Sequence, residues 1–507
     1  MTNKAAAVVE EREPAVANAA AFDERKPSID ERKPSIGRPT FTFALFSLAF
    51  VLRLGAAFML AGEPVWDGHY YDFGARRIAE GHGYSDDRVV NGITEWHPWC
   101  HYPVGYSGYL AFFYKVFGAS ATVAHVANAL AGGLLPVIVF FLAREVLSER
   151  RARIAGALVA LHPGLVLYGA LVMSEPLSAL LVMASFLAAV RGARVRGVLT
   201  GVVAGALVLG VAALVRPQAL LCAPFLALVA AKDGSRASSS WMKKAKLAVV
   251  ACVVALLPVL PWTARNCKVM DGCALVSTNA GWNLAIGAFP RATGRFETLR
   301  SSDGCREVTG QVQQDRCWLG YGLTHIRESP GRWLGLIPAK LGFTFDHESF
   351  AVEYLREARP SAWPEDRRVL WRSIITTAHR LLVAASALGF VALARPKERT
   401  RTRLVQNVLV GLVVVGAFLA FTADTPIFWP IVVGACLVPW LPLPGRPAAP
   451  AALLLPVVVV LSTVVAHAIF FGEDRYHIVV TPALCLLAAA ALRLPKESTP
   501  KYSVANN

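Results

Sequence analysis

The chain has 507 residues, of which 55% are hydrophobic and 17% charged, and it carries a formal net charge of +16. Its mean hydropathy is +0.46, and apolar runs recur from one end to the other instead of gathering in one core. These properties exclude a water-soluble globular enzyme and predict an integral membrane protein.

Twelve apolar runs follow one another along the chain. Roughly 17 to 25 such residues cross about 30 Å of hydrocarbon as an α-helix. Because the fourth and sixth runs are short, we expect an all-α polytopic protein with about twelve transmembrane helices. The runs cover residues 41–61, 120–143, 154–172, 177–190, 197–215, 218–231, 247–263, 374–394, 405–422, 426–443, 451–471 and 477–492.

The positive charge is explained by membrane topology and does not indicate nucleic-acid binding. Lysine and arginine collect in alternate loops, which the positive-inside rule places in the cytoplasm together with both termini. Contact with anionic membrane lipids is a secondary consequence. The basic loops lie at 144–153, 191–196, 232–246 and 395–403.

The two ends of the chain differ in composition from the apolar part. Residues 1–38 are polar and contain the sequence DERKPSI twice in tandem, so we expect a disordered cytoplasmic tail. The run at 41–61 lacks a small-residue cleavage site and is interpreted as the first permanent span. The transmembrane domain then extends over 39–495, and a second cytoplasmic tail covers 496–507.

Two long segments face the outside in this topology, one at 62–119 and one at 264–373. Each contains an amphipathic stretch that is typical of a helix lying on the bilayer surface. Tyr70–Glu80 is the first and is ended by Gly81 and Gly83. Pro330–Phe345 is the second, with Lys340 among its apolar residues.

Five of the nine cysteines lie in the external segments. Cys267 and Cys273 are close in sequence, as are Cys305 and Cys317, which predicts two disulfides in an oxidising compartment and leaves Cys100 over. A zinc site is the competing interpretation, but the spacings match no usual metal pattern.

External carboxylates are the first candidates for chemistry. Asp67 either caps the helix that follows or acts in catalysis. Asp72 has a structural explanation, because Arg76 four residues on offers it an ion pair. Asp86, Asp87 and Glu95 lie in a loop punctuated by glycine, where they are either solvated or supply a second carboxylate or a metal contact.

Aromatic residues fill the stretch from Glu95 to Gly118, EWHPWCHYPVGYSGYLAFFYKVFG, which also holds His97, His101 and Tyr102. One interpretation is an aromatic belt at the level of the lipid headgroups. The other is a surface on which a sugar ring stacks, with these three side chains contacting the sugar or the acceptor.

Arg216, Arg265 and Arg475 lie at predicted external ends of spans, where an arginine is costly unless it pairs or reaches the interface. Their guanidinium groups fit a phosphate, so the three could converge on an anionic headgroup. Glu175, at another external turn, either caps the next helix or faces the same cavity as Arg216.

Taken in order, several stretches resemble the GT-C superfamily of membrane glycosyltransferases, in particular the bacterial family related to protein O-mannosyltransferases and lipid A aminoarabinose transferases. The order of the stretches and their fit to the loop topology carry this resemblance. They are WDGHYYDFGARRIAEGHGYS, YPVGYSGYLAFFYKVFG, SEPL, LVRP, PWTARN, STNAGWNLAIGAFPRATG and DRYHIVVTP.

The resemblance implies a transferase that takes a sugar from a polyprenyl phosphate in the outer leaflet. The family's acidic residue in the first external loop matches Asp67, and its phosphate-binding cations correspond to Arg265 and Arg475. The chain departs from the protein mannosyltransferase pattern, since Gly68 stands where an Asp-Glu pair is expected.

We therefore expect an inverting glycosyltransferase of the cell membrane, with its active site external and Asp67 as the base. The acceptor is a glycan, lipid or protein, no cofactor is certain, and a divalent metal is an open alternative. A transporter or flippase of a lipid-linked sugar is the rival hypothesis, although no internal repeat of the kind common in transporters is visible.

Overall fold

The computed structural model describes residues 37–230, 241–392, 401–422, 428–440 and 449–492. The two predicted tails lie outside the described residues, apart from residues 37 and 38, which begin the first helix. Most of the predicted cytoplasmic loop at 395–403 and part of the loop at 232–246 also lie outside them. The chain divides into two compact units at Thr42, and the described part of the first unit is helical throughout. All further elements belong to the second unit.

Long apolar helices dominate the described residues, which confirms the prediction of an all-α polytopic membrane protein. Seven of these helices are long and apolar enough to cross a membrane. They are α1 (Gly37–Leu60), α4 (Ala121–Arg144), α7 (Glu175–Val195), α8 (Val198–Val215), α16 (Glu365–Ala392), α17 (Arg401–Thr422) and α19 (Ala451–Ile469).

The remaining predicted spans are broken or short. α5 (Glu149–Leu161) continues into α6 (Pro163–Leu167) after a bend of 51°, and α9 (Trp241–Leu256) into α10 (Leu260–Val269) after a bend of 50°. Prolines at the breaks remove a backbone donor. Counting each bent pair as one span gives up to nine spans among the described residues, so the predicted count of twelve is not confirmed. Shorter apolar helices occupy the other runs: η3 (Pro217–Ala230), α18 (Phe428–Leu437) and α20 (Thr481–Ala491).

The segment at 62–119, which is predicted to be external, contains a helix, a hairpin and a second helix. α2 (Asp67–Glu80) includes the predicted surface helix and ends at Gly81, whose φ of 93° is left-handed. The expected loop around Glu95 is instead an antiparallel hairpin of β1 (Ser85–Val90) and β2 (Ile93–Pro98). Asn91 and Gly92 both have positive φ, as the tight turn between two strands requires. α3 (Val104–Phe117) completes the segment.

The segment at 264–373, which is also predicted to be external, contains several short helices. The prediction of a single surface helix over Pro330–Phe345 is wrong. The helix is interrupted at Leu336, directly before Ile337-Pro338, and two shorter helices form instead. The elements in order are α11 (Ala280–Ala288), η4 (Ser301–Asp303), α12 (Gln311–Glu328), α13 (Pro330–Gly335), α14 (Ile337–Phe345), α15 (Phe350–Ala358) and η5 (Pro360–Ala362). Trp318 of α12 packs against Phe289, Phe471 and Tyr476, which joins this segment to the chain after α19.

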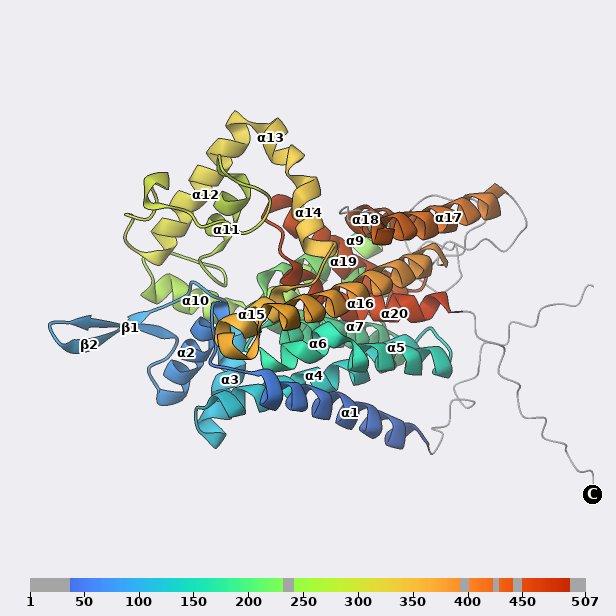
Figure 1. Ribbon diagram of the computed structural model, residues 1–507, viewed down its shortest axis with the longest axis horizontal. Helices are drawn as coiled ribbons and strands as arrows, with labels where there is room; N and C mark the ends of the chain where they lie inside the picture. Colours follow the sequence, from blue (N-terminus) through green and yellow to red (C-terminus); the bar gives the residue numbers. More distant parts are fainter. Residues whose placement is uncertain (1–36, 231–240, 393–400, 423–427, 441–448, 493–507) are drawn as a thin grey trace, which may run out of the picture. The chain divides into compact units, whose positions relative to one another are not determined.

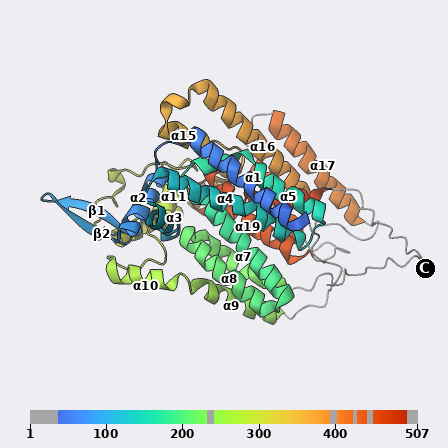
Figure 2. The same cartoon turned by 90° about the horizontal axis from the view of Figure 1, so that it is seen from below.

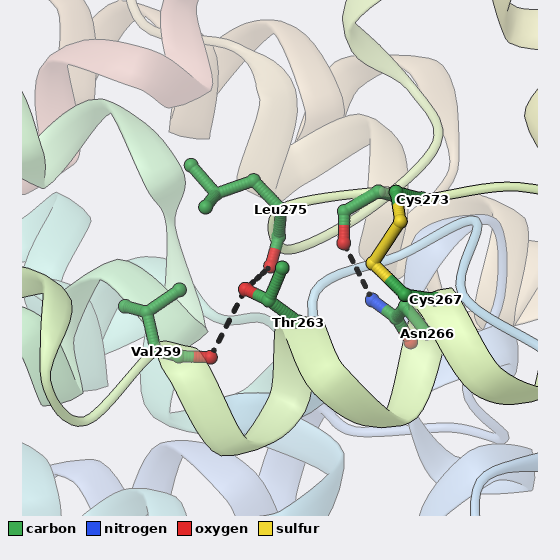
Figure 3. The surroundings of a disulfide bond; sticks show 7 residues. Val259, Thr263, Asn266, Cys267, Cys273 and Leu275 are labelled. Atoms are coloured by element: carbon green, nitrogen blue, oxygen red, sulfur yellow. Dashed lines mark hydrogen bonds between the residues drawn. A yellow bond between two sulfur atoms is a disulfide. The ribbon is translucent and has the colours of Figure 1, made fainter.

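Both predicted disulfides are present, Cys267 with Cys273 and Cys305 with Cys317, and Cys100 is free and buried. Figure 3 shows how the first lies beside the end of α10. The side chain of Asn266 donates to the carbonyl of Ala274 at 3.1 Å, and the Thr263 hydroxyl donates to that of Leu275 at 2.7 Å. The chain that returns from the disulfide is therefore held against α10.

Several elements of the segments 62–119 and 264–373 lie together within the second unit. In both views α2, the hairpin, α3, α10 and α11 are found at one end of the long helices α4, α7 and α8 (Figures 1 and 2). A final short turn, η7 (Asp474–Val479), follows α19 and precedes α20. It brings Arg475 and its neighbours back toward α2.

Candidate active site

Asp67 is the first residue of α2, and its carboxylate is bound by two side chains from distant parts of the sequence. The Tyr102 hydroxyl donates to Oδ1 at 2.7 Å, and the Arg475 guanidinium donates to Oδ2. The helix cap is Trp66, which has a positive φ of 50°, a conformation that is strained for a bulky residue. The carboxylate of Asp67 therefore points into a network of side chains and does not cap α2.

The surroundings of Asp67 favour its ionised form. Burial alone would raise the pKa of this carboxyl, but the charge of Arg475, the Tyr102 hydroxyl and the charge of Arg216 outweigh it and lower the pKa. The side chain keeps 22% of its surface exposed. Asp67 is thus an anion with part of its surface accessible.

Gly68 is fixed by packing. A Cβ atom at this position would lie 2.2 Å from the Tyr354 hydroxyl and 2.8 Å from the carbonyl oxygen of Val172. The Tyr354 hydroxyl also accepts a hydrogen bond from the backbone of Val65 at 3.2 Å. An Asp-Glu pair therefore cannot be accommodated here without displacing the turn that holds Asp67.

Arg475 lies in η7 between two carboxylates. It pairs with Asp67 on one side and with Glu473 on the other, and its guanidinium lies 5.1 Å from the ring centre of Phe350 and 5.0 Å from that of Tyr476. Flanking aromatic rings stabilise a buried cation. Only 13% of the side chain is exposed.

Glu473 is a second acidic residue of the site that the sequence analysis did not select. Burial raises the pKa of its carboxyl to about 7, although the charge of Arg475 acts in the opposite direction. The only hint in the sequence was its position two residues before Arg475. Glu473 changes charge near neutral pH beside the cation that binds Asp67.

Arg216 and Glu175 form a second, largely buried ion pair near the first. Their side chains are 2.7 Å apart, and the Glu175 side chain has no exposed surface. Arg216 also donates to the Ser174 hydroxyl at 3.3 Å and lies 5.3 Å from the ring centre of Tyr476. Glu175 and Arg216 therefore lie side by side, and the expectation that they face one cavity stays a prediction.

Aromatic side chains surround Tyr102. Its ring stacks on Tyr70 with centroids 5.5 Å apart, meets Tyr71 edge to face at 5.3 Å and lies 5.7 Å from Trp99. The neighbouring His101 ring meets Tyr102 at 5.0 Å, and burial lowers the pKa of this histidine. Tyr102 and His101 therefore lie beside Asp67, among aromatic rings that can pack on a sugar.

Other predicted residues have different partners. Asp72 binds Arg76 at 2.7 Å, as predicted, and also accepts from the Tyr114 hydroxyl. Glu95 and His97 lie on the exposed strand β2 and pair with each other at 3.5 Å. The structure does not bring these residues into the network around Asp67.

Arg265 and Lys340 each bind backbone carbonyls. Arg265 donates to the backbone carbonyl of Tyr84 at 2.6 Å and to that of Trp99 at 3.0 Å, so its guanidinium binds the backbone of these aromatic residues. Lys340 donates to the carbonyl of Ile469 at 3.1 Å, at the end of α19. Burial lowers the pKa of Lys340 to about 7.

A cavity of about 340 Å³ lies beside Glu473 and extends toward α14 and α16. Its walls combine cationic, acidic and apolar groups. The lining residues are Arg295, Phe296, Phe343, His347, Ser349, Arg372, Gly472, Glu473 and Asp474. Among the described residues, one group could hold a metal ion, and it consists of Glu348, His379 and His477.

Residues 101–262 match the family of dolichyl-phosphate-mannose-protein mannosyltransferases. The match covers roughly a third of the chain and supports the resemblance to GT-C membrane glycosyltransferases. A sequence search of curated proteins found no match.

Two solved structures match this chain at low sequence identity. The oligosaccharyltransferase of Archaeoglobus fulgidus, tethered to an acceptor peptide, is 14% identical with a TM-score of 0.44, over 90% of this chain and 49% of that one. ArnT of Cupriavidus metallidurans in its apo state is 16% identical with a TM-score of 0.37, over 89% and 77%. The chain thus spans about half the length of the oligosaccharyltransferase.

Proposed function

We propose that this protein is an inverting glycosyltransferase that moves a sugar from a polyprenyl phosphate to an acceptor hydroxyl at the external face of the cell membrane. The observation that carries the proposal is the Asp67 carboxylate, partly exposed and paired with the buried Arg475. A base beside a phosphate-binding cation is what transfer from a lipid phosphate needs. The match to mannosyltransferases that use a dolichyl-phosphate sugar supports this donor class.

In the proposed reaction Asp67 is the general base. The acceptor oxygen attacks the anomeric carbon of the sugar while its proton passes to the Asp67 carboxylate. The bond between that carbon and the phosphate oxygen breaks, and the lipid phosphate leaves with the electron pair. Attack opposite the leaving group inverts the anomeric centre.

Arg475 has two roles in this scheme. Its guanidinium stabilises the negative charge that grows on the departing phosphate. The same charge lowers the pKa of Asp67 in the structure. When the donor phosphate binds the Arg475 guanidinium, the interaction between Arg475 and Asp67 weakens. The pKa of Asp67 then rises, and Asp67 becomes a stronger base. Binding of the donor thereby prepares the base for the acceptor.

The donor phosphate enters through the cavity beside Glu473. Arg295 and Arg372 supply positive charge to its wall, while Phe296 and Phe343 supply apolar surface, a combination that suits an anionic headgroup with a lipid tail. Arg216 lies near the same Tyr476 ring as Arg475 and adds a second cation near the phosphate.

The experiment uses the full chain, purified in detergent, with synthetic short-chain polyprenyl-phosphate sugars and a mixture of candidate acceptors. Release of free polyprenyl phosphate is measured. We expect Asp67→Asn to reduce the rate by at least about a hundredfold, the usual contribution of a general base.

The matched control is Asp72→Asn. Asp72 lies on the same helix and, like Asp67, binds one arginine and one tyrosine hydroxyl. This variant should keep most of the transfer rate. Full activity of Asp67→Asn would contradict the assignment. Movement of a labelled lipid sugar across liposomes, without release of lipid phosphate, would favour a flippase instead.

A further inference from the structure

Three side chains from separate parts of the chain meet in the interior. Glu348 lies between α14 and α15, His379 in α16 and His477 in η7. Their ligand atoms all lie within 4.8 Å of one another, and the two imidazole rings stack with centroids 3.8 Å apart. Each side chain is almost completely buried, with Glu348 1% exposed and both histidines 0%.

Backbone carbonyls determine which nitrogen of each histidine carries the proton. Nδ1 of His477 lies 2.7 Å from the carbonyl of Thr344, and Nε2 of His379 lies 2.8 Å from that of Phe345. A carbonyl only accepts, so these two nitrogens donate. The other nitrogens, Nε2 of His477 and Nδ1 of His379, are left with free lone pairs.

Glu348 presents further acceptors to the same space. Both of its carboxylate oxygens, Nδ1 of His379 and Nε2 of His477 have no hydrogen-bond partner within the described parts of the chain. Nε2 of His477 lies 3.5 Å from Oε2 of Glu348. Buried acceptors that face one another cost free energy unless a positive centre lies between them.

A single proton can satisfy only part of this group. Placed between Glu348 and His477, it leaves Nδ1 of His379 and the second carboxylate oxygen without a donor. A divalent cation accepts electron pairs from all three side chains at once. Ligand atoms bound tetrahedrally at about 2.1 Å lie about 3.4 Å apart, which is close to the 3.5 Å observed for one pair.

We propose that Glu348, His379 and His477 bind a divalent transition-metal ion of the zinc class. Two imidazoles and one carboxylate favour such an ion over Mg²⁺ or Ca²⁺, which prefer oxygen ligands alone. A histidine whose other nitrogen donates to a carbonyl is also the usual arrangement around bound zinc. This proposal rests on the geometry of the three side chains, and it can be tested without measuring the transfer reaction proposed above.

The ion would join three segments that are far apart in sequence. Asp474 already fastens η7 to the start of α15, because its carboxylate accepts from the backbone of Phe350 at 2.8 Å and from that of Ser349. The metal would attach η7 a second time, through His477, which lies three residues after Asp474. Arg475 lies between these two attachment points, so the metal would hold its position.

The test measures metal in the full chain, purified through a tag without histidine, saturated with Zn²⁺ and then gel-filtered. We expect about one zinc per chain to remain bound, and Glu348→Gln to lower this at least about tenfold. His347→Gln is the matched control, because His347 is the neighbouring histidine and lies outside the group. A wild-type protein that retains no zinc, or a Glu348→Gln protein that retains all of it, would overturn the proposal.

A second measurement covers the case in which Glu348→Gln does not fold. Wild-type protein is stripped with a chelator and titrated with Co²⁺, whose visible absorption reports a low-symmetry site of nitrogen and oxygen ligands. We expect a saturable absorption band that Zn²⁺ abolishes, and a lower thermal unfolding midpoint after stripping. A Co²⁺ spectrum identical to that of the free ion in buffer would overturn the proposal.

Discussion

Asp67 and Arg475 form an ion pair across 408 residues of sequence. One is the first residue of α2, and the other lies in η7, the last turn before α20. Their pairing brings together residues from the first and last parts of the described chain. It also explains why Asp67, which stands where a helix cap would be expected, does not act as a cap.

Tyr102→Phe tests how the base is tuned. The hydroxyl lowers the pKa of Asp67, so removing it raises that pKa and moves the acidic limb of the kcat/KM profile to higher pH. At neutral pH Asp67 stays ionised in the variant, so the raised pKa does not itself slow the reaction. The hydrogen bond that orients the carboxylate is lost, and kcat/KM should fall about five- to thirtyfold for a loss of about 1 to 2 kcal/mol. Tyr109→Phe, whose hydroxyl binds the carbonyl of Ala127 instead, should leave the profile unchanged.

Arg475→Lys keeps the charge but loses the planar fork of the guanidinium. Because a lysine cannot contact Asp67 and a phosphate in the same way, we expect the KM for the donor to rise by at least about tenfold. The measurement is a titration of donor at saturating acceptor. An unchanged KM would remove Arg475 from the phosphate site.

Arg265→Lys distinguishes the two arginines that the sequence treated alike. Arg265 binds the carbonyls of Tyr84 and Trp99, so its replacement should lower the thermal unfolding midpoint, at a cost of about 1 to 2 kcal/mol. The KM for the donor should change much less than in Arg475→Lys. The reverse pattern would restore Arg265 as the phosphate ligand.

The charge of Glu473 should make donor binding depend on pH. Below its pKa of about 7 the carboxyl is neutral and leaves Arg475 free to attract phosphate. Above that pKa the carboxylate competes for Arg475 and repels the donor, so affinity should fall several-fold between about pH 6 and about pH 8. A phosphodiester donor, whose own charge is constant over this range, is used in the binding assay. Glu473→Gln should show no such fall, and an identical fall in that variant would exclude Glu473 as its cause.

The disulfide between Cys305 and Cys317 should stabilise the second external segment. It closes a short loop, and Cys305 packs in the same cluster as Trp318 and Tyr476, next to Arg475. Replacing both cysteines with serine should cost about 2 to 4 kcal/mol and lower the thermal unfolding midpoint. In a control variant, Cys267 and Cys273 are replaced with serine, so that a reductant opens only the Cys305–Cys317 disulfide. Adding the reductant to this variant should still lower its thermal unfolding midpoint. A midpoint that does not respond to loss of the Cys305 bridge would contradict this role.

Features that depend on neighbouring residues were predictable from the sequence. Hydrophobic runs predicted the membrane helices. The spacing of Asp72 and Arg76 predicted an ion pair on one helix face, and the cysteines that are close in sequence predicted both disulfides. Each of these follows from helical periodicity or from short loop closure. The hairpin at Glu95 was missed because this stretch was interpreted as a loop, although Asn91-Gly92 is a typical two-residue turn between strands. The break at Leu336 was missed because Pro338 interrupts a helix that the amphipathic pattern alone would continue.

Contacts between distant segments were decided by the tertiary structure alone. The sequence selected Asp67, Arg475 and Arg216 separately, but it could not show that Asp67 binds Arg475, that Arg265 turns to backbone carbonyls, or that Glu473 completes the site. It also held no local pattern that joins Glu348, His379 and His477. The physical reason is that burial and charge pairing act through space, so the role of a carboxylate or a guanidinium depends on which side chains the packed helices bring against it.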